Sequence, residues 1–238
     1  MLRNESLEEL TDGERYTSDS VVKVDPDGCR GCHLCCEVVE DTIILDPYDL
    51  HALKKGLGKT FEELMRREIA LGVYDGIILP HLMLEEDREI SAEEALSAPI
   101  SGTGKHCVFL GQEGEMRGRC LIHAFRPGFC RLFPMGRLYE EDGFSYVLLK
   151  NECPYADKKA CTVRDWLGIE DLEEYEAYVT EWHDLIVRIR EELPKENEED
   201  RQKISLFLLQ SFYITPYGER FYEDFRERLE KVKGVLFA

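Results

Sequence analysis

The sequence contains no apolar run of about 18 residues or more, so no segment has the character of a membrane-spanning helix. Positive charge is also scarce: 30 Lys and Arg stand against 49 Asp and Glu, which gives a net charge of -19. This charge repels nucleic acid and anionic membranes, so we expect neither as a partner. Residues 1–20 lack the apolar centre of a secretory signal peptide. We therefore expect a cytoplasmic protein.

Cysteine, by contrast, is abundant, since the chain has nine. A chain of 238 residues can bury a core that folds without cross-links, so size does not explain this number. Thiols stay reduced in the cytoplasm, where clustered cysteines serve mainly as metal ligands or catalytic groups. Scattered thiols that pack as small apolar groups are the simpler alternative. Four cysteines within residues 29–36 argue against that alternative.

These four form the run Cys29-x-x-Cys32-x-x-Cys35-Cys36. Spacings of two residues allow successive thiolates to surround one centre. Zinc commonly draws its ligands from two separated Cys-x-x-Cys pairs, whereas a cubane iron–sulfur cluster takes consecutive cysteines from one run and a distant fourth. The run therefore favours iron–sulfur, and zinc stays the alternative.

The doublet at the end of the run needs its own explanation, because neighbouring side chains point in different directions and seldom bind one metal ion. On a helix, Cys29, Cys32 and Cys36 would share a face. In a ferredoxin-like loop, Cys29, Cys32 and Cys35 would form the set, and the glycines before Cys29 and Cys32 favour this loop. The cysteine left over would serve a second centre.

Later cysteines complete the candidate ligand set. The metal ligands expected from the whole sequence are Cys29, Cys32, Cys35, Cys36, Cys107, Cys120, Cys130 and Cys153. Eight thiols are enough for two four-ligand centres, or for one centre and a redox pair. The sequence does not divide them between centres.

The region from Lys105 to Arg137 is locally basic, with six Lys and Arg against two Glu. Within it, prolines bracket a predicted helical turn that carries Cys130 between two arginines. We expect Arg126 and Arg131 to bind the cofactor or an anionic substrate. Pairing with surface carboxylates is the alternative. Histidines near the cysteines, among them His123, are more often hydrogen-bonding neighbours than ligands.

Capping signals and apolar spacing predict an α+β fold, mostly α, in which an irregular cysteine-rich core with short strands packs against several helices. One helix is expected from Pro47 to Gly56 or Gly58, and a second from Thr60 to Leu71. Short strands are expected over 42–45, 77–84, 107–110 and 120–123, and a hairpin over 137–149.

The chain divides into three predicted parts. Residues 1–20 are expected to form a flexible tail, residues 21–165 a cysteine-cluster metal-binding domain, and residues 166–238 a helical C-terminal extension. Within the extension, helices are expected over 172–189 and 204–214, followed by a break at 216–218 and a final helix.

The order of the cysteine motifs resembles that of the YkgJ-like cysteine-cluster family, which is described as zinc- or iron-chelating. The run from Cys29 to Cys36 corresponds to the CxxCxxCC opening of the family. His123 stands where Tyr is usual, and Cys161 lies outside the pattern, so Cys161 is not counted as a ligand. The resemblance covers residues 25–165, with further matching elements at Cys107–Leu110, Cys120–His123, Arg126-Pro127, Cys130-Arg131 and Asn151–Pro154.

The family also covers flagellin lysine N-methylase, whose similar region is associated with a [4Fe-4S] centre. The resemblance therefore implies iron over zinc, in one or two clusters. It does not carry methylation over, because no Gly-rich loop for S-adenosylmethionine follows a predicted strand. We expect an iron–sulfur protein with a redox or cluster-dependent modifying role, and a protein substrate or redox partner. The alternative is a zinc-binding structural or interaction module, or a metal carrier without catalysis.

Overall fold

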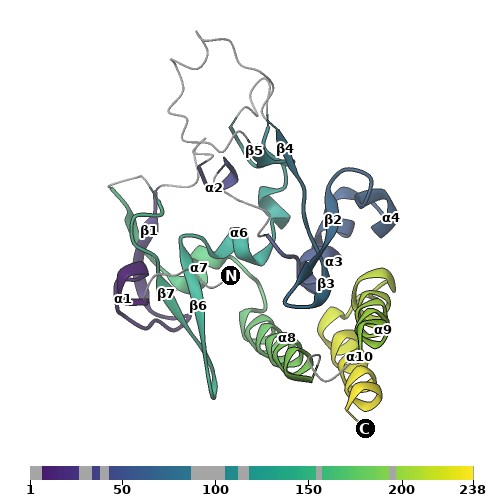
Figure 1. The fold of residues 1–238 in the computed structure, drawn as a ribbon. Coiled ribbons are helices and arrows are strands. Elements are labelled where there is room, and N and C mark those ends of the chain that lie inside the picture. Colours follow the sequence, from purple (N-terminus) through teal and green to yellow (C-terminus); the bar gives the residue numbers. More distant parts are fainter. Residues whose placement is uncertain are drawn as a thin grey trace. The chain divides into compact units, whose positions relative to one another are not determined.

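The structure is a computed structural model, which describes residues 7–26, 34–37, 43–86, 105–111, 118–153, 157–192 and 197–237. Helices predominate and the sheets have two strands each, so the chain is an α+β protein, mostly α (Figure 1). The chain forms two compact units. Unit 1 contains residues 1–43 and 82–168, and unit 2 contains residues 44–81 and 169–238. The division expected near residue 165 stays a prediction.

Unit 1 begins with α1 (Leu7–Leu10) and β1 (Val21–Asp25), and β1 pairs with the antiparallel strand β8 (Lys159–Thr162). Residues 7–20, which the sequence assigns to a flexible tail, are among those that the structure describes. Thr11 and Tyr16 in this segment form β-bridges with Leu149 and Tyr146. These backbone contacts were not predicted, and the flexible tail stays a prediction.

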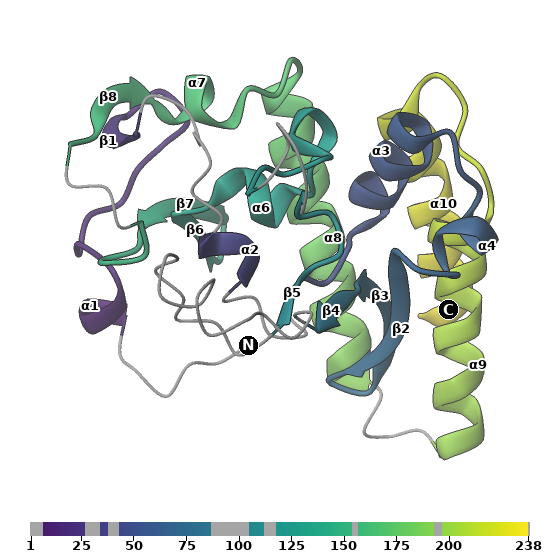
Figure 2. The same ribbon diagram turned by 90° about the horizontal axis from the view of Figure 1, so that it is seen from above.

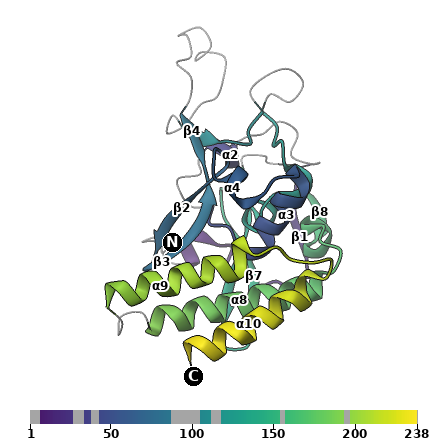
Figure 3. The same cartoon turned by 90° about the vertical axis from the view of Figure 1, so that its right-hand side faces the viewer.

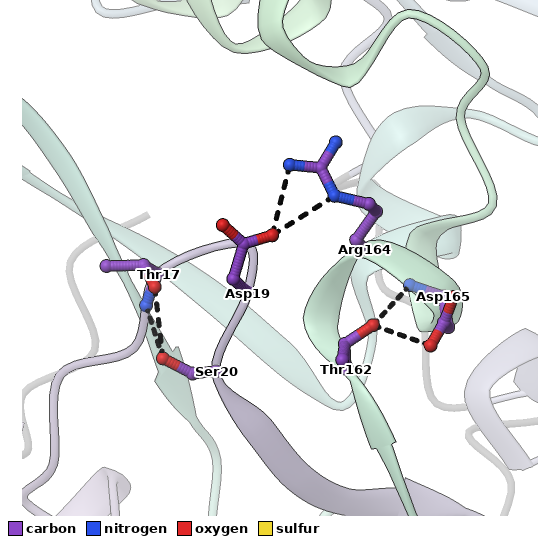
Figure 4. Close-up of polar contacts among 6 residues, drawn as sticks. All are labelled: Thr17, Asp19, Ser20, Thr162, Arg164 and Asp165. Atoms are coloured by element: carbon purple, nitrogen blue, oxygen red, sulfur yellow. Dashed lines mark hydrogen bonds and ion pairs between the residues drawn. The ribbon is translucent and has the colours of Figure 1, made fainter.

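Polar contacts connect this segment to α7 (Val163–Leu167) in the same unit. Two nitrogens of Arg164, Nε and Nη2, donate to Oδ1 of Asp19 at 3.2 and 3.1 Å (Figure 4). The hydroxyl of Thr162 caps α7 by accepting the N–H of Asp165 at 3.1 Å. Exposed ion pairs contribute little stability, but these contacts set where α7 begins relative to β1.

The predicted hairpin of unit 1 is confirmed as β6 (Met135–Glu140) and β7 (Gly143–Leu148), with Met135 opposite Leu148. A second ladder joins β4 (Leu84–Glu86) to β5 (Lys105–Cys107). The strand expected over 107–110 is wrong, because the chain turns directly after Cys107. The strand expected over 120–123 is also wrong: only Cys120 forms a bridge, and η2 (His123–Phe125), a 3-10 helix, follows.

Unit 2 begins with a helix that the sequence predicted, α3 (Pro47–Leu57). Asp46 caps its N-terminus by accepting the N–H of Asp49. Gly58 ends it in the left-handed conformation, with φ of 64°. Of the strand expected over 42–45, Ile44 makes a bridge to His81, and position 42 lies outside the described residues.

The next predicted helix is only partly correct. Thr60 and Glu63 form the expected capping box, but α4 (Phe61–Leu64) ends after one turn. The chain then enters β2 (Ile69–Tyr74), which pairs with β3 (Ile77–Leu82). Between these strands Asp75 and Gly76 have φ of 51° and 86°, values that suit a two-residue hairpin turn. The hairpin turn at Asp75-Gly76 therefore takes precedence over the continuation of the helix that the capping box at Thr60 begins.

The C-terminal part of unit 2 contains α8 (Leu172–Glu192), α9 (Glu198–Leu209) and α10 (Phe221–Leu236), which lie side by side (Figure 3). The π-helix η4 (Gln210–Ile214) extends α9 up to the predicted break. No helix among the described residues is long and apolar enough to span a membrane.

Buried tyrosines join these helices to the first segment of unit 2. The Tyr178 hydroxyl accepts the N–H of Tyr48 at 2.9 Å, and the Tyr213 hydroxyl donates to the carbonyl of Leu45 at 3.0 Å. Both side chains are almost fully buried. Most of the aromatic residues of this unit therefore form its core.

Candidate metal centre

A pocket in unit 1 brings together cysteines that are far apart in the sequence. Of the six predicted ligands in the described residues, five line it: Cys35, Cys36, Cys107, Cys120 and Cys130. Its volume is about 50 Å³, which exceeds the roughly 10–15 Å³ that a single water needs. The pocket therefore has room for a metal group between the thiols.

Three local structures carry these thiols. Cys35 and Cys36 lie on α2 (Leu34–Glu37), which contacts β5, as Figure 2 shows. Cys107 ends β5, and the turn after it places Leu110 in a bridge with Cys120. Cys130 lies in the middle of α6 (Gly128–Leu132), the helical turn that the sequence predicted. The thiols thus lie on separate local structures, and tertiary packing brings them together.

The neighbouring thiols of α2 interact with one another. Their Sγ atoms are 4.0 Å apart, and all cysteines of the described residues are free thiols. The hydrogen bond from Cys36 lowers the pKa of Cys35 to about 7, against the opposing effect of burial and with help from the charge of Arg126. The same hydrogen bond and burial raise the pKa of Cys36. One thiolate is therefore favoured in the pair.

The remaining buried thiol resists ionisation. Burial raises the pKa of Cys107 to about 11. A bound cation would reverse this preference, because metal coordination stabilises the thiolate directly. All thiols of the pocket are therefore expected to ionise only when a metal cation is bound between them.

Arg126 is the only charged side chain among the described residues that line the pocket. Its Nη1 donates to Nε2 of His123 at 2.7 Å, and its Nε is buried without a hydrogen-bond partner among the described residues. Because Arg can only donate, His123 uses Nε2 as an acceptor, which makes that atom a poor ligand for a metal. A thiolate-bound metal would give Nε an acceptor, so the residues present fit such a group.

Arg131, which the sequence grouped with Arg126, is not among the residues that line this pocket. Its Nη1 donates to the carbonyl of Leu167 and its Nη2 to that of Ala124, at 3.1 and 3.0 Å. These contacts join the C-terminal end of α7 to η2. The predicted role of Arg131 at the cofactor stays a prediction.

The other cysteines lie elsewhere or outside the description. Cys153 is not among the pocket residues, and its carbonyl accepts from Nζ of Lys158 at 3.3 Å. Cys161, which was not counted as a ligand, lies on β8 opposite Val22. Cys29 and Cys32 lie outside the described residues. Within the described part, no three His, Cys, Asp or Glu side chains stand in a metal-binding arrangement.

The apolar walls of the pocket were not predicted. They are formed by Ile43, Leu82, Ile122, Phe129 and Phe133. The positions of Phe129 and Phe133, one before and three after Cys130, are the one signal that could have revealed them. Ile43 and Leu82 meet through a backbone hydrogen bond of 3.0 Å between distant segments, for which the sequence gives no local signal.

Comparison with known proteins identifies the family to which this part of the sequence belongs. Residues 28–162, more than half of the chain, match the model of the family CxxCxxCC, described as "Putative zinc- or iron-chelating domain". The match includes all eight predicted ligands and confirms the resemblance seen in the sequence. No curated protein and no solved structure matches the chain. The chain belongs to the CxxCxxCC family of zinc- or iron-chelating domains.

Proposed function

We propose that the pocket of unit 1 holds an iron–sulfur cluster, [4Fe-4S], with a redox or cluster-dependent modifying role. The observation that carries this proposal is that one pocket combines thiols of a single run with thiols from distant segments. Five line it, and Cys29 and Cys32 precede two of these in the same run. Zinc commonly draws its four ligands from two separated Cys-x-x-Cys pairs, whereas one run of cysteines completed by distant ones is typical of a cubane cluster.

The surroundings of the thiols also suit a cluster. Four thiolates give a cluster a negative total charge, and Arg126 offers a compensating positive charge in the same pocket. Apolar side chains such as Ile122, which is 2% exposed, exclude water from part of the site. A low local dielectric strengthens the attraction between the guanidinium and an anionic centre. When bound, the cluster would supply one-electron chemistry.

Phe129 gives the site an edge that faces solvent. This side chain lines the pocket and is 55% exposed. Leu121, next to the pocket residues Cys120 and Ile122, is 50% exposed. A redox partner or protein substrate would approach the centre at this edge, because the rate of electron transfer falls steeply with distance.

Anaerobic purification of the full chain, followed by metal analysis, tests the proposal. We expect a brown protein with a broad absorption band near 400 nm and about four iron and four sulfide per chain. Dithionite should bleach the band, and reoxidation should restore it. Cys36→Ser should abolish the band, while Cys161→Ser is the matched control that should keep it.

A colourless protein with stoichiometric zinc, and with neither iron nor sulfide, would overturn the proposal. It would favour the zinc-binding structural or interaction module instead. Growth media with either metal in excess, and reconstitution of the metal-free protein with iron and sulfide or with zinc, exclude an effect of metal supply. Loss of zinc to a weak chelator within minutes would favour a carrier.

A further inference from the structure

One nitrogen of the Arg126 guanidinium makes a hydrogen bond, while a second, buried nitrogen has no partner among the described residues. Its Nη1 donates to Nε2 of His123 at 2.7 Å, whereas its Nε is buried and has no hydrogen-bond partner among the described residues. Buried donors without an acceptor are uncommon, since they lose their hydration without replacement. An Arg side chain cannot relieve this cost by losing a proton. The Nε–H therefore calls for an acceptor that is not part of the described structure.

The lining of the pocket limits what this acceptor can be. Apart from Arg126, the described side chains that line the pocket are five cysteines and five apolar residues. A neutral thiol is a weak acceptor, but a thiolate bound to a metal keeps lone pairs and negative charge that attract an N–H donor. Outer hydrogen bonds of this kind tune metal centres.

We propose that Arg126 is a positioning residue of the metal centre: its Nε–H donates to a sulfur of the thiolate-bound group, and His123 holds the guanidinium in place through Nη1. This inference rests on the proposed metal site, and it applies to iron–sulfur and to zinc alike. It separates Arg126 from Arg131, whose guanidinium donates to the backbone carbonyls of Leu167 and Ala124.

The role of His123 follows from the direction of its hydrogen bond. Because Nε2 accepts from Arg126, the imidazole is neutral and its proton resides on Nδ1. Burial, and then the charges of Arg126 and Arg131, lower the pKa of His123, which agrees with a neutral ring. His123 thus acts on the centre through Arg126.

Rates of metal loss from the loaded full chain test the role of Arg126. Arg126→Gln should release iron or zinc to a chelator about tenfold faster than the wild type, because a charge-assisted hydrogen bond is lost. Arg119→Gln, at an exposed site outside the pocket lining, removes the same charge and should leave the rate unchanged. Arg126→Lys keeps the charge without the Nε–H and should lie between Arg126→Gln and the wild type.

The midpoint potential of the iron–sulfur form gives a second readout. Reduction makes the cluster more negative, so loss of a donor disfavours the reduced state. Arg126→Gln should therefore shift the potential to a more negative value, and Arg119→Gln should not. For His123, His123→Gln should keep the wild-type rate, since its amide oxygen can accept from Nη1, while His123→Ala should accelerate metal loss.

Equal rates and potentials for Arg126→Gln and Arg119→Gln would overturn the inference. If Arg126→Lys lost metal at the wild-type rate, the proposed hydrogen bond from Nε would be wrong, because the positive charge alone would then explain the slow loss. Circular dichroism of each variant shows whether it is folded before metal loss is compared. If the wild type carries zinc, the proposed cluster fails, and the rates of zinc loss still decide the role of Arg126.

Discussion

The guanidinium of Arg131 donates a hydrogen bond to the backbone carbonyl of Leu167, 3.1 Å from its Nη1. Leu167 is the last residue of α7, so this bond satisfies a carbonyl that the helix leaves open. A second hydrogen bond runs from Nη2 to the backbone carbonyl of Ala124 in η2. Arg131 therefore connects the C-terminal end of α7 to η2.

Arg131→Ala should reduce the free energy of unfolding by about 1–3 kcal/mol, with most of the loss from the two carbonyls left without their donor. Urea denaturation of the metal-free protein measures this change. The folded variant should load as much metal as the wild type. Loss of metal with unchanged stability would instead support the cofactor role that the sequence suggested.

Cys36→Ser should prevent metal loading, because a serine hydroxyl is a far weaker ligand than a thiolate. Metal analysis after anaerobic purification measures the content per chain. Cys161→Ser removes a thiol that lies on β8 opposite Val22 and should retain the full content. Equal losses in both variants would show that the ligand set is wrong.

Gly58→Ala should lower the stability of the protein by about 1 kcal/mol, since φ of 64° is costly for a residue with a Cβ. The space around the position is open, so no clash adds to this cost. Gly56→Ala, inside α3, is a matched control that should raise stability by about 0.5–1 kcal/mol. Thermal unfolding measures both effects: the midpoint should fall for Gly58→Ala and rise for Gly56→Ala. Shifts in the same direction would contradict the prediction.

Tyr213→Phe should destabilise the protein by about 1–3 kcal/mol, because the carbonyl of Leu45 loses a buried donor. Chemical denaturation measures the change. Tyr139→Phe, at a partly exposed site on β6, should cost less. A larger effect at Tyr139 would show that the buried hydrogen bond is not the decisive contact.

Local signals in the sequence predicted some of the local structures, namely α3 and the β6–β7 hairpin. Asp46 and Gly58 set the ends of α3, and the turn before Gly143 set the hairpin, because each feature depends on a few neighbouring residues. The Asp75-Gly76 turn carried the same kind of signal. It was outweighed in the prediction by the capping box at Thr60, which starts α4 without fixing its length.

Five of the cysteines predicted as ligands line the pocket, and the ligand set itself stays a prediction, whereas the apolar walls were not predicted. Spacing and motif order pointed to the five cysteines that line the pocket. The distinction between Arg126 and Arg131 depends on whether a side chain turns toward the pocket or toward the carbonyl of Leu167. Likewise, the meeting of Ile43 and Leu82 depends on packing between distant segments. Such contacts arise from the tertiary structure and leave no periodic pattern.

The order in which unit 1 is completed has a consequence during protein synthesis. Residues 44–81, which belong to unit 2, are made between the two segments that form unit 1. At about 5–20 residues per second, Cys107, the first pocket thiol of the later segment, leaves the ribosome roughly 4–14 s after Cys35. Over that interval the first thiols have no partners from the later segment, so a reducing environment must protect them until the rest of the pocket has been made.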